Sequence, residues 1–361
     1  MKRLVFTVTN DLNYDQRMIR ICTSLHKAGY SVLLVGRQTH ASSLPAARNF
    51  RQKRIVCLFN RGALFYIEYN IKLFFFLLVQ PLDLICAIDL DTILPCIAVS
   101  RMRRKKRVYD AHELFTEMKE VVLRKNIHTM WKGIERLAVP GFKYAYTVND
   151  EIAGLLKQEY DVPFAVIRNV PFLQSLSPVP TEPFILYQGA VNHGRCFETL
   201  IPAFAYIAMP LHIYGEGNFL NEAKALVRQH GLEQHIFFKG MVTPENLKKI
   251  TPTAQLGITL FENTGLSNYY SLANRFFDYI HAGVPQICVN FPVYSSINAK
   301  SNIAVMVDDL SSENLAASIN AVLADQQLYQ HLKQNCFKAR EVYNWQSEEL
   351  LLLSFYKKIF A

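Results

Sequence analysis

Residues 257–290 read GITLFENTGLSNYYSLANRFFDYIHAGVPQICVN, and this stretch decides the fold class. An apolar run is followed by a polar loop, an amphipathic run with helical spacing, a Gly-Val-Pro stop and a second apolar run. This order is typical of a strand, a crossover helix and a second strand in one parallel sheet. The stretch therefore predicts a doubly wound α/β domain.

The same alternation of short apolar runs and longer amphipathic runs extends in both directions from this stretch. It breaks once, at 170–183, where four prolines and little periodicity predict a linker. We therefore expect two Rossmann-like domains facing across a cleft, with ligands bound beyond the carboxyl ends of the strands. The expected division is an N-terminal domain at 1–168, a linker at 169–183, a second domain at 184–344 and a C-terminal helix at about 345–361 that packs back on the first domain.

Composition places the chain among globular proteins of a reducing compartment. It has 361 residues, of which 50% are hydrophobic, and seven scattered cysteines without a C-x-x-C pair. This pattern favours free buried thiols over disulfides or a zinc site. The N-terminal apolar run is too short for a signal peptide and predicts a first strand. We expect a cytoplasmic protein.

Charge is shared unevenly between the two halves. Residues 1–170 hold 26 Lys and Arg against 15 Asp and Glu, whereas 171–361 hold 13 against 15. A basic half indicates an anionic partner, and no nucleic-acid-binding motif accompanies it. The run RMRRKKR at 101–107 has the ordinary interpretation of a solvated turn, and the apolar run 64–79 that of a buried helix. The alternative is that this domain docks on the inner face of the cytoplasmic membrane.

The opening stretch also carries a candidate binding site. Ser271 stands where a helix N-cap is expected, and Arg275 adds charge to a helix N-terminus that could bind an anion. Asp278 follows one turn later and could accept hydrogen bonds from two neighbouring hydroxyls, such as those of a ribose. A phosphate site followed by a hydroxyl site describes a nucleotide, but an amphipathic helix with an Arg–Asp pair fits these residues equally well.

Polar and glycine-containing turns follow several other predicted strands. The turn YQGAVNHGR contains Gly189 and Arg195, and YGEGN contains Gly215 and Gly217; each permits close backbone approach to a ligand. In the first domain, His112 follows a strand in VYDAHE and could contact a substrate hydroxyl or cap the strand end. Residues at the end of the first strand are expected on the acceptor side of the cleft: Asp11, Asp15 and Arg17.

The pair Asp89 and Asp91 in AIDLD has the spacing of a metal-binding motif. Because it follows a strand and opens a helix, we interpret it as a helix cap and expect no metal.

Taken together, these motifs resemble the bacterial family 4, or group 1, glycosyltransferases of the GT-B fold. The resemblance runs through nearly the whole chain, from TNDLNYDQR through YDAHELFTE, YQGAVNHGR and YGEG to LANRFFDYIHAGVPQI. The last block is the most specific part.

The resemblance implies roles for residues of the second domain. Asp278 takes the place of the acidic residue that binds the nucleotide ribose, with Asp instead of the usual Glu. Tyr270 stands where the family often has a second Glu, and the backbone of Tyr270, Ser271 and Leu272 would hold the diphosphate or sugar. Met241 and Val242 stand where the family lines the base.

Basic residues and one histidine complete the implied site. Arg195 matches a basic residue that contacts the donor phosphates, whereas Ala190 stands where the family usually has Arg. Arg275 could supply the missing charge. His112 matches the histidine that contacts the donor sugar near the reacting carbon.

The implied activity is transfer of a sugar from a nucleotide diphosphate sugar to an acceptor hydroxyl, with retention at the anomeric carbon and without a metal or other cofactor. Lipid-linked or saccharide acceptors of cell-surface polysaccharide or glycolipid synthesis are the expected partners. Two alternatives stay open: a GT-B nucleotide-sugar epimerase, and a non-catalytic nucleotide-sugar-binding protein.

Overall fold

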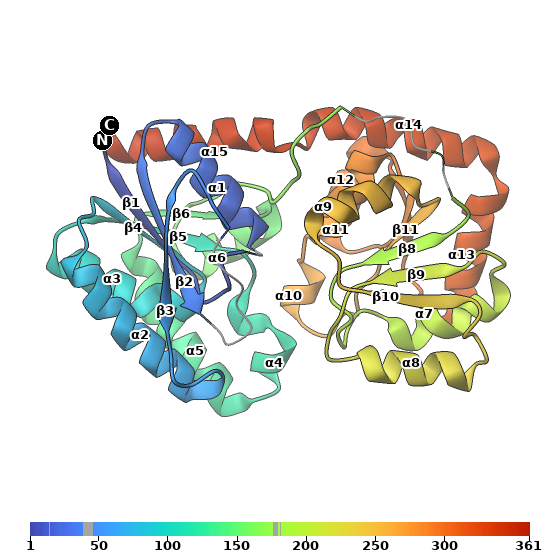
Figure 1. Ribbon diagram of the computed structural model, residues 1–361, viewed down its shortest axis with the longest axis horizontal. Coiled ribbons are helices and arrows are strands. Elements are labelled where there is room, and N and C mark those ends of the chain that lie inside the picture. Colours follow the sequence, from blue (N-terminus) through green and yellow to red (C-terminus); the bar gives the residue numbers. More distant parts are fainter. Residues whose placement is uncertain (14, 39–45, 176–179, 181) are drawn as a thin grey trace. The chain divides into compact units, whose positions relative to one another are not determined.

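The computed structural model describes residues 1–361 except 14, 39–45, 176–179 and 181. The chain forms two compact units, one of Met1–Asn169 with Glu348–Ala361 and the other of Val170–Ser347. Part of the predicted linker, at 176–179 and 181, lies outside the described residues. The predicted α/β architecture of two parallel sheets with helices is confirmed (Figure 1).

The first unit contains a seven-stranded sheet in which every pairing is parallel. The spatial order is β3-β2-β1-β4-β5-β6-β7, so the direction of winding changes between β1 and β4. The central strands are buried apolar runs, as expected for a sheet covered on both faces. The strands are β1 Arg3–Thr7, β2 Ser31–Gln38, β3 Arg51–Val56, β4 Leu84–Ile88, β5 Lys106–Ala111, β6 Tyr144–Thr147 and β7 Phe164–Val166.

Helices cover both faces of this sheet. Figure 1 shows α1 and α15 on the upper side and α2, α3 and α5 on the lower side. The helices and 3₁₀ turns are α1 Gln16–Lys27, α2 Gly62–Val79, η1 Leu90–Thr92, α3 Ile93–Met102, η2 Phe115–Glu117, α4 Lys119–Val122, α5 Lys125–Ala138, η3 Val139–Gly141, α6 Asp150–Tyr160 and α15 Trp345–Phe360.

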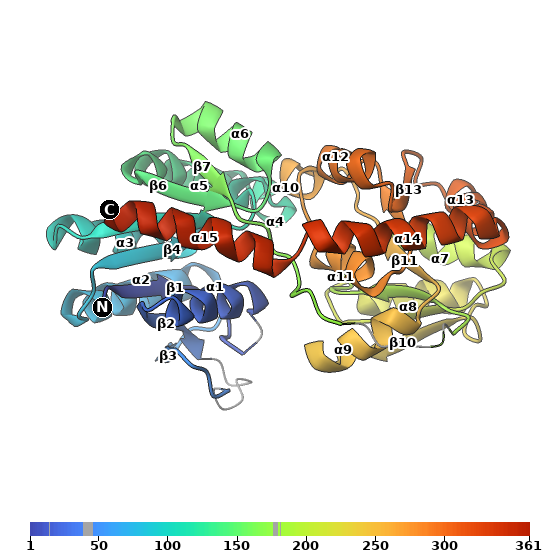
Figure 2. The same ribbon diagram turned by 90° about the horizontal axis from the view of Figure 1, so that it is seen from above.

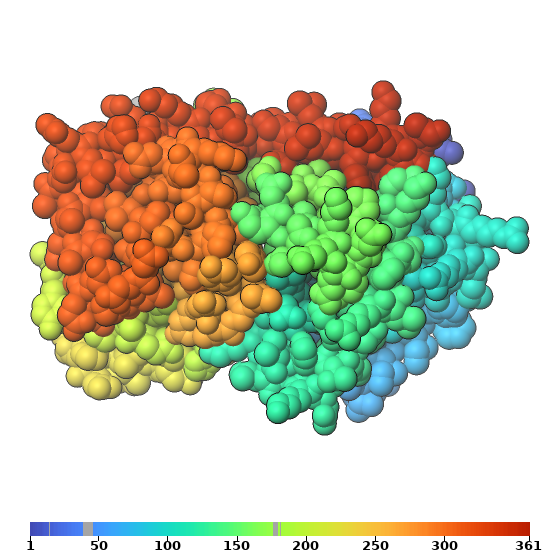
Figure 3. Space-filling view, turned by 180° about the vertical axis from the view of Figure 1, so that it is seen from behind, coloured from blue at the N-terminus to red at the C-terminus, as the bar shows by residue number. Residues whose placement is uncertain are grey.

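The last helix, α15, completes the core of the first unit, as predicted. Tyr356 is fully buried, and its ring packs against Phe6 of β1 and Tyr146 of β6. Glu348 accepts a hydrogen bond of 2.8 Å from the backbone N–H of Arg168. Seen from above, α15 lies across the strands, and in the space-filling view its dark red atoms lie over the first unit (Figures 2 and 3).

The second unit contains a six-stranded parallel sheet in the order β10-β9-β8-β11-β12-β13. Its winding direction changes between β8 and β11, and the loops at the carboxyl ends of these strands are where ligands bind in such sheets. The strands are β8 Ile185–Gln188, β9 Leu211–Tyr214, β10 Ile236–Gly240, β11 Leu256–Thr259, β12 Gln286–Val289 and β13 Ala304–Val307. The helices and 3₁₀ turns are α7 Phe197–Ala203, η4 Phe204–Tyr206, α8 Leu220–Gln229, α9 Pro244–Ile250, η5 Thr251–Thr253, α10 Leu266–Tyr269, α11 Asn274–Ala282, α12 Pro292–Ser301, α13 Ser312–Ala324 and α14 Gln326–Val342.

All seven cysteines are free and buried, which confirms the expectation of buried thiols. Burial raises the pKa of several of them, including Cys96 and Cys336, to about 12. These thiols are therefore neutral packing groups at physiological pH.

Candidate active site

Asp278 lies half-buried in the middle of α11, and its orientation is fixed by a neighbouring strand. Its Oδ2 accepts a hydrogen bond of 2.8 Å from Nε2 of Gln188, the last residue of β8. Gln188 in turn accepts a hydrogen bond of 2.8 Å from the hydroxyl of Thr251. The carboxylate is thus held at the carboxyl edge of the sheet before any ligand arrives, so binding a pair of hydroxyls would cost little additional ordering.

The loop before α11 is held by a tyrosine rather than by the predicted serine cap. The N-cap of α11 is Ala273, which has no side-chain cap, so the prediction for Ser271 is wrong. The hydroxyl of Tyr294 on α12 accepts a hydrogen bond of 3.0 Å from the Ala273 N–H and lies 3.3 Å from Ser271 Oγ. The Tyr270 ring packs against Tyr269, with centroids 4.9 Å apart. Of the loop side chains, Leu272 packs against the core of the second unit.

Two arginines stack on one phenylalanine at this edge of the sheet. The guanidinium of Arg195 lies 4.2 Å from the ring centroid of Phe261, and that of Arg275 lies 4.7 Å from the same centroid. Arg195 is partly exposed and donates to Asn268 Oδ1 at 3.3 Å. The stack concentrates two positive charges beside the glycine turns, where it could stabilise an anion.

Arg275 is more deeply placed than the sequence suggested. Its side chain is 7% exposed, and it donates to the Tyr187 hydroxyl at 3.4 Å and to the Leu260 carbonyl at 3.2 Å. The expectation that it extends from the first turn of the helix beside a surface anion site is corrected. Its charge instead lies under Gly189, whose Cβ, if present, would be 3.4 Å from Arg275 Nη1.

The glycine turns are packed against each other. Gly215 has a φ of +156°, and a Cβ there would come within 1.8 Å of the Gly189 carbonyl oxygen. A Cβ on Gly217 would meet the Val191 carbonyl and Asn192 Oδ1 at 2.3 Å. These glycines therefore allow the turn after β8 and the turn after β9 to touch, which fixes the backbone beside Arg195.

Met241 and Val242, the predicted base-lining residues, follow β10 at the carboxyl edge of the same sheet. Met241 is exposed and Val242 is half-buried. Because β10 is an edge strand, two strands away from β8, this pair lies to one side of Asp278 along the edge.

In the first unit, His112 follows β5 and lies between two carboxylates. Its Nε2 is 3.1 Å from Asp110 Oδ2, its Nδ1 is 3.5 Å from Asp89 Oδ2, and its backbone N–H donates to Asp89 Oδ1 at 2.8 Å. Burial alone would lower the pKa of His112, but Asp110 and Asp89 outweigh burial and raise this pKa to about 9. His112 is therefore a charged hydrogen-bond donor at neutral pH.

The three residues predicted on the acceptor side have structural partners. Asp11 forms an ion pair of 3.0 Å with Arg54, and Asp15 caps α1 by accepting from the Met18 N–H at 3.0 Å. Arg17 is buried, 3% exposed, and pairs with Asp110 at 2.9 Å. Its expected position facing an acceptor is corrected, because the side chain lies in the core behind His112.

The expected helix-cap role of Asp89 and Asp91 is also corrected. Asp89 precedes η1 with a φ of 52°, a left-handed conformation that strains a non-glycine residue, and its carboxylate makes no cap hydrogen bond. It binds the His112 backbone and faces its ring instead. Asp91 accepts a hydrogen bond from Thr9. Among the described residues, no group of three or more His, Cys, Asp or Glu side chains could hold a metal ion.

A pH titration tests the charge on His112. The folded-state pKa of about 9 lies above the ordinary value of about 6.5, so the imidazolium stabilises the fold fully below pH 6.5 and this stabilisation is lost as pH rises through 9. We expect the stability advantage of the parent over His112→Gln to shrink by about 1–3 kcal/mol between pH 6.5 and 9.5 in urea unfolding. The exposed His230→Gln should show no such change, and an equal advantage at both pH values would contradict the assignment.

Sequence reasoning missed four supporting residues: Gln188, Tyr294, Phe261 and Asp110 as the partner of Arg17. The signal for Gln188 was present, since a polar residue ends the buried run ILYQ just before a glycine turn. The other three act through contacts between distant segments, for which the sequence contains no local signal.

Comparison with known proteins now adds to this geometry. Residues 172–339 match the family model of group 1 glycosyl transferases. This part of the chain is a group 1 glycosyltransferase domain. An uncharacterized glycosyltransferase of Methanocaldococcus jannaschii is 22% identical over 211 residues, which is 56% of this chain and 52% of that protein. The chain thus spans about half the length of the curated relative that it matches.

Solved structures resemble the chain over its whole length. A sucrose-phosphate synthase from Thermosynechococcus elongatus gives a TM-score of 0.75 at 16% identity, covering 100% of this chain and 99% of that one. HepE from Anabaena, in complex with UDP-glucose, gives 0.77 at 12% identity, covering 99% and 100%. TarM from S. aureus, in complex with UDP and saccharides, gives 0.74 at 11% identity, covering 100% of both. These likenesses show that the glycosyltransferase domain and the first unit share the GT-B fold.

Proposed function

We propose that the protein is a retaining glycosyltransferase that moves a sugar from a nucleotide diphosphate sugar to an acceptor hydroxyl. The observation that carries the proposal is the carboxylate of Asp278, fixed by Gln188 at the carboxyl edge of the second sheet. A fixed carboxylate beside stacked arginines suits a ligand with paired hydroxyls next to a diphosphate. HepE of Anabaena, which has the same fold, was solved with UDP and with UDP-glucose.

The proposed reaction breaks the bond between the anomeric carbon and the phosphate oxygen. The bond to the acceptor oxygen forms on the same face of the sugar, and the acceptor proton passes to the departing phosphate. Negative charge develops on the diphosphate, where Arg195 is placed to stabilise it at the exposed end of the Phe261 stack. Arg275 adds positive potential from below the Gly189 turn. Neither contribution requires a metal ion.

The first unit contributes the second half of the proposed machinery. His112, held as an imidazolium by Asp110 and Asp89, donates a hydrogen bond to a hydroxyl of the donor sugar. The proposed acceptor is a saccharide or lipid-linked hydroxyl of cell-surface polysaccharide or glycolipid synthesis. The saccharide complexes of TarM, which has the same fold, support a carbohydrate acceptor.

Nucleotide binding by Asp278→Asn is the first test. Asn keeps the contact with Gln188 but loses the charge, so we expect about 10- to 100-fold weaker binding of the preferred nucleotide, the effect of losing a hydrogen bond to a charged group. Thermal stabilisation by UDP, GDP, ADP and dTDP sugars measures it, since a hundredfold excess of ligand over its Kd adds about 2.7 kcal/mol of stability.

Glu233→Gln is the matched control, because Glu233 is exposed in the turn that leads to the amino end of β10, away from the carboxyl edge. It should bind like the parent. Equal stabilisation of the parent and Asp278→Asn by the same nucleotide sugar would remove Asp278 from the site and with it the main support for this function.

Product analysis separates transfer from the alternatives. With donor alone, an epimerase would convert the nucleotide sugar into its epimer, and a binding protein would leave it unchanged. The proposed transferase should form product only with an acceptor, with the anomeric configuration of the donor by NMR, and at the same rate in excess EDTA. An inverted product or loss of activity in EDTA would contradict the retaining, metal-independent mechanism.

A further inference from the structure

An apolar stripe runs along the outer side of α2, from one end of the helix to the other. Five large apolar side chains, each more than half exposed, recur at spacings of three or four residues and so share one face: Leu64, Ile67, Ile71, Phe75 and Val79. We call this set the α2 stripe. Contiguous apolar surface of this kind is unusual on a soluble protein and marks a contact site.

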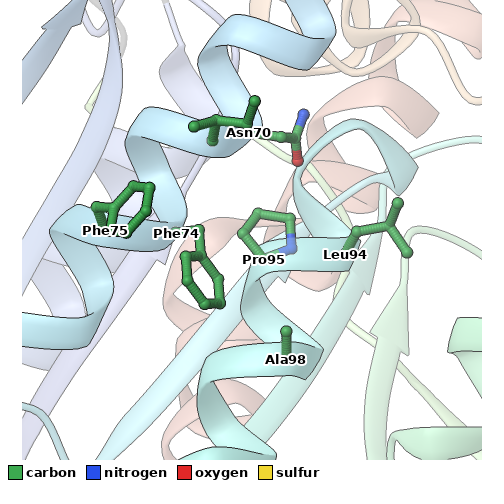
Figure 4. A pocket seen from close by; sticks show the side chains of 7 residues that line it. Asn70, Phe74, Phe75, Leu94, Pro95 and Ala98 are labelled. Atoms are coloured by element: carbon green, nitrogen blue, oxygen red, sulfur yellow. The ribbon is translucent and has the colours of Figure 1, made fainter.

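The α2 stripe continues onto α3 across a hollow of about 290 Å³. Phe74 and Phe75 of α2 lie on one side of the hollow, and Leu94, Pro95 and Ala98 of α3 lie on the other (Figure 4). The lining exposes almost no polar atoms. The stripe and the hollow together therefore form one apolar surface on two neighbouring helices.

The acidic residue within α2 is neutralised at the margin of this surface. Glu68 pairs with Lys72 at 2.6 Å and accepts hydrogen bonds from the backbone N–H groups of Leu58 and Phe59 at 2.9 and 3.0 Å. The Lys72 ammonium, followed by these two N–H groups, lowers the pKa of Glu68 to about 2. The carboxylate is thus bound within the unit, and Leu58 and Phe59 extend the apolar surface, since both are exposed.

Positive charge surrounds the surface. In the fully described segment 61–138, the exposed acidic residues are Glu113 and Glu120. The exposed basic residues of the same segment are Arg61, Lys72, Arg101, Arg104, Lys106, Arg124, Lys125 and Arg136. At the carboxyl end of α2, Arg103 donates to the Leu77 and Gln80 carbonyls at 2.9 and 2.6 Å, which joins the basic turn after α3 to the end of the stripe.

We propose that the α2 stripe docks on an anionic lipid bilayer, with α2 lying in the plane of the headgroups. An apolar face bordered by Lys and Arg is the pattern of helices that lie in this interface, where apolar burial and attraction to anionic lipid add together. Association of two copies through the same face would bring the basic borders together, which is unfavourable. The charge therefore favours the bilayer as the partner.

The same helix is long and apolar enough to cross a membrane by composition, but its inner face is committed to the first unit. Phe65, Leu73 and Leu77 are buried, and the buried Tyr69 hydroxyl donates to the Val8 carbonyl at 2.6 Å. Insertion across a bilayer would expose this core, so α2 contacts lipid only with its outer side. The surface would hold the first unit beside lipid-linked acceptors, which is the one respect in which this inference rests on the proposed function.

Vesicle flotation without any sugar nucleotide tests the docking separately from catalysis. The parent should bind vesicles of phosphatidylglycerol and phosphatidylcholine at low salt, with little binding to phosphatidylcholine alone. Ile71→Gln/Phe75→Gln should weaken binding by about tenfold or more, because two inserted side chains become polar. The control Leu350→Gln/Leu351→Gln changes two exposed apolar residues of α15 on the other side of the sheet and should stay within about twofold of the parent.

Charge and insertion are measured by further variants. Arg61→Gln/Arg104→Gln/Arg136→Gln should weaken binding to anionic vesicles by about tenfold or more and reduce its salt dependence. Phe75→Trp should shift its emission to the blue on anionic vesicles, whereas Leu350→Trp should not; the native Trp131 and Trp345 are buried and provide a constant background.

Three results would overturn the proposal. These are no binding of the parent to anionic vesicles at low salt, equal binding by the Ile71→Gln/Phe75→Gln variant, and equal binding to neutral vesicles. A dimer that disappears in the Ile71→Gln/Phe75→Gln variant, without vesicle binding, would assign the stripe to contact between two copies instead. None of these results bears on nucleotide binding at Asp278, so the two proposals can fail independently.

Discussion

Replacing Arg17 with Met is expected to lower the free energy of unfolding by about 3 kcal/mol. The Arg17–Asp110 pair is fully buried, with the side chains 3% and 0% exposed at a distance of 2.9 Å. Met fills the space but leaves the Asp110 carboxylate in the core without its main counter-charge. His112, 3.1 Å from Asp110, compensates in part and keeps the loss at the lower end of the range for broken buried pairs. Urea unfolding followed by circular dichroism measures the change.

Arg3→Met is the matched control, because it removes the same kind of pair at the surface. Arg3 and Asp83 lie 3.3 Å apart with side chains 47% and 24% exposed, so solvent screens their attraction. The expected loss is below about 1 kcal/mol. If both variants lose the same stability, burial of the Arg17 pair is not what makes it matter.

Replacing Arg195 with Gln is expected to reduce kcat by about 10²- to 10³-fold, the effect of losing one donor that stabilises charge developing in the transition state. The guanidinium rests on Phe261 at 4.2 Å and is the exposed member of the stacked arginine pair. Gln keeps the polarity but removes the charge that opposes the departing diphosphate. Initial rates with the preferred donor and acceptor measure the change.

Two further variants define what Arg195 does. Arg195→Lys keeps the charge and should recover most of the activity, which a merely structural role for the stack would not allow. Arg228→Gln removes an exposed charge from the last turn of α8 and should leave kcat unchanged. A kcat for Arg195→Gln within about threefold of the parent would exclude the proposed role.

Much of the fold could be predicted because its strands are buried on both faces. Runs such as LICAI of β4 and QICV of β12 are continuously apolar, and the helices between them carry clear amphipathic spacing. The prediction missed β3, whose sequence RQKRIV carries three charges, because it is an exposed edge strand. It also missed α12, in which proline occupies the first helical position and weakens the periodic signal.

The candidate site was predictable in its positions but not in the directions of its long side chains. Asp278 could be located because it follows a strand, a loop and one helical turn in a recognisable order. Arg17 and Arg275 stand at similar places in the sequence, yet both point into the core, toward Asp110 and the Tyr187–Phe261 rings. Local sequence specifies which helix carries an arginine, whereas distant residues decide where its guanidinium ends.

The last helix has a consequence for how the chain is made. The first unit takes its final core residues from Glu348–Ala361, including the buried Leu352, Tyr356 and Ile359. During synthesis its seven strands leave the ribosome first, but the layer that covers them arrives only when translation ends. Nearly all of the second unit is continuous in sequence and can therefore complete its folding earlier. The domain translated first is thus the domain finished last, and until termination its sheet has an uncovered apolar face that is open to chaperones.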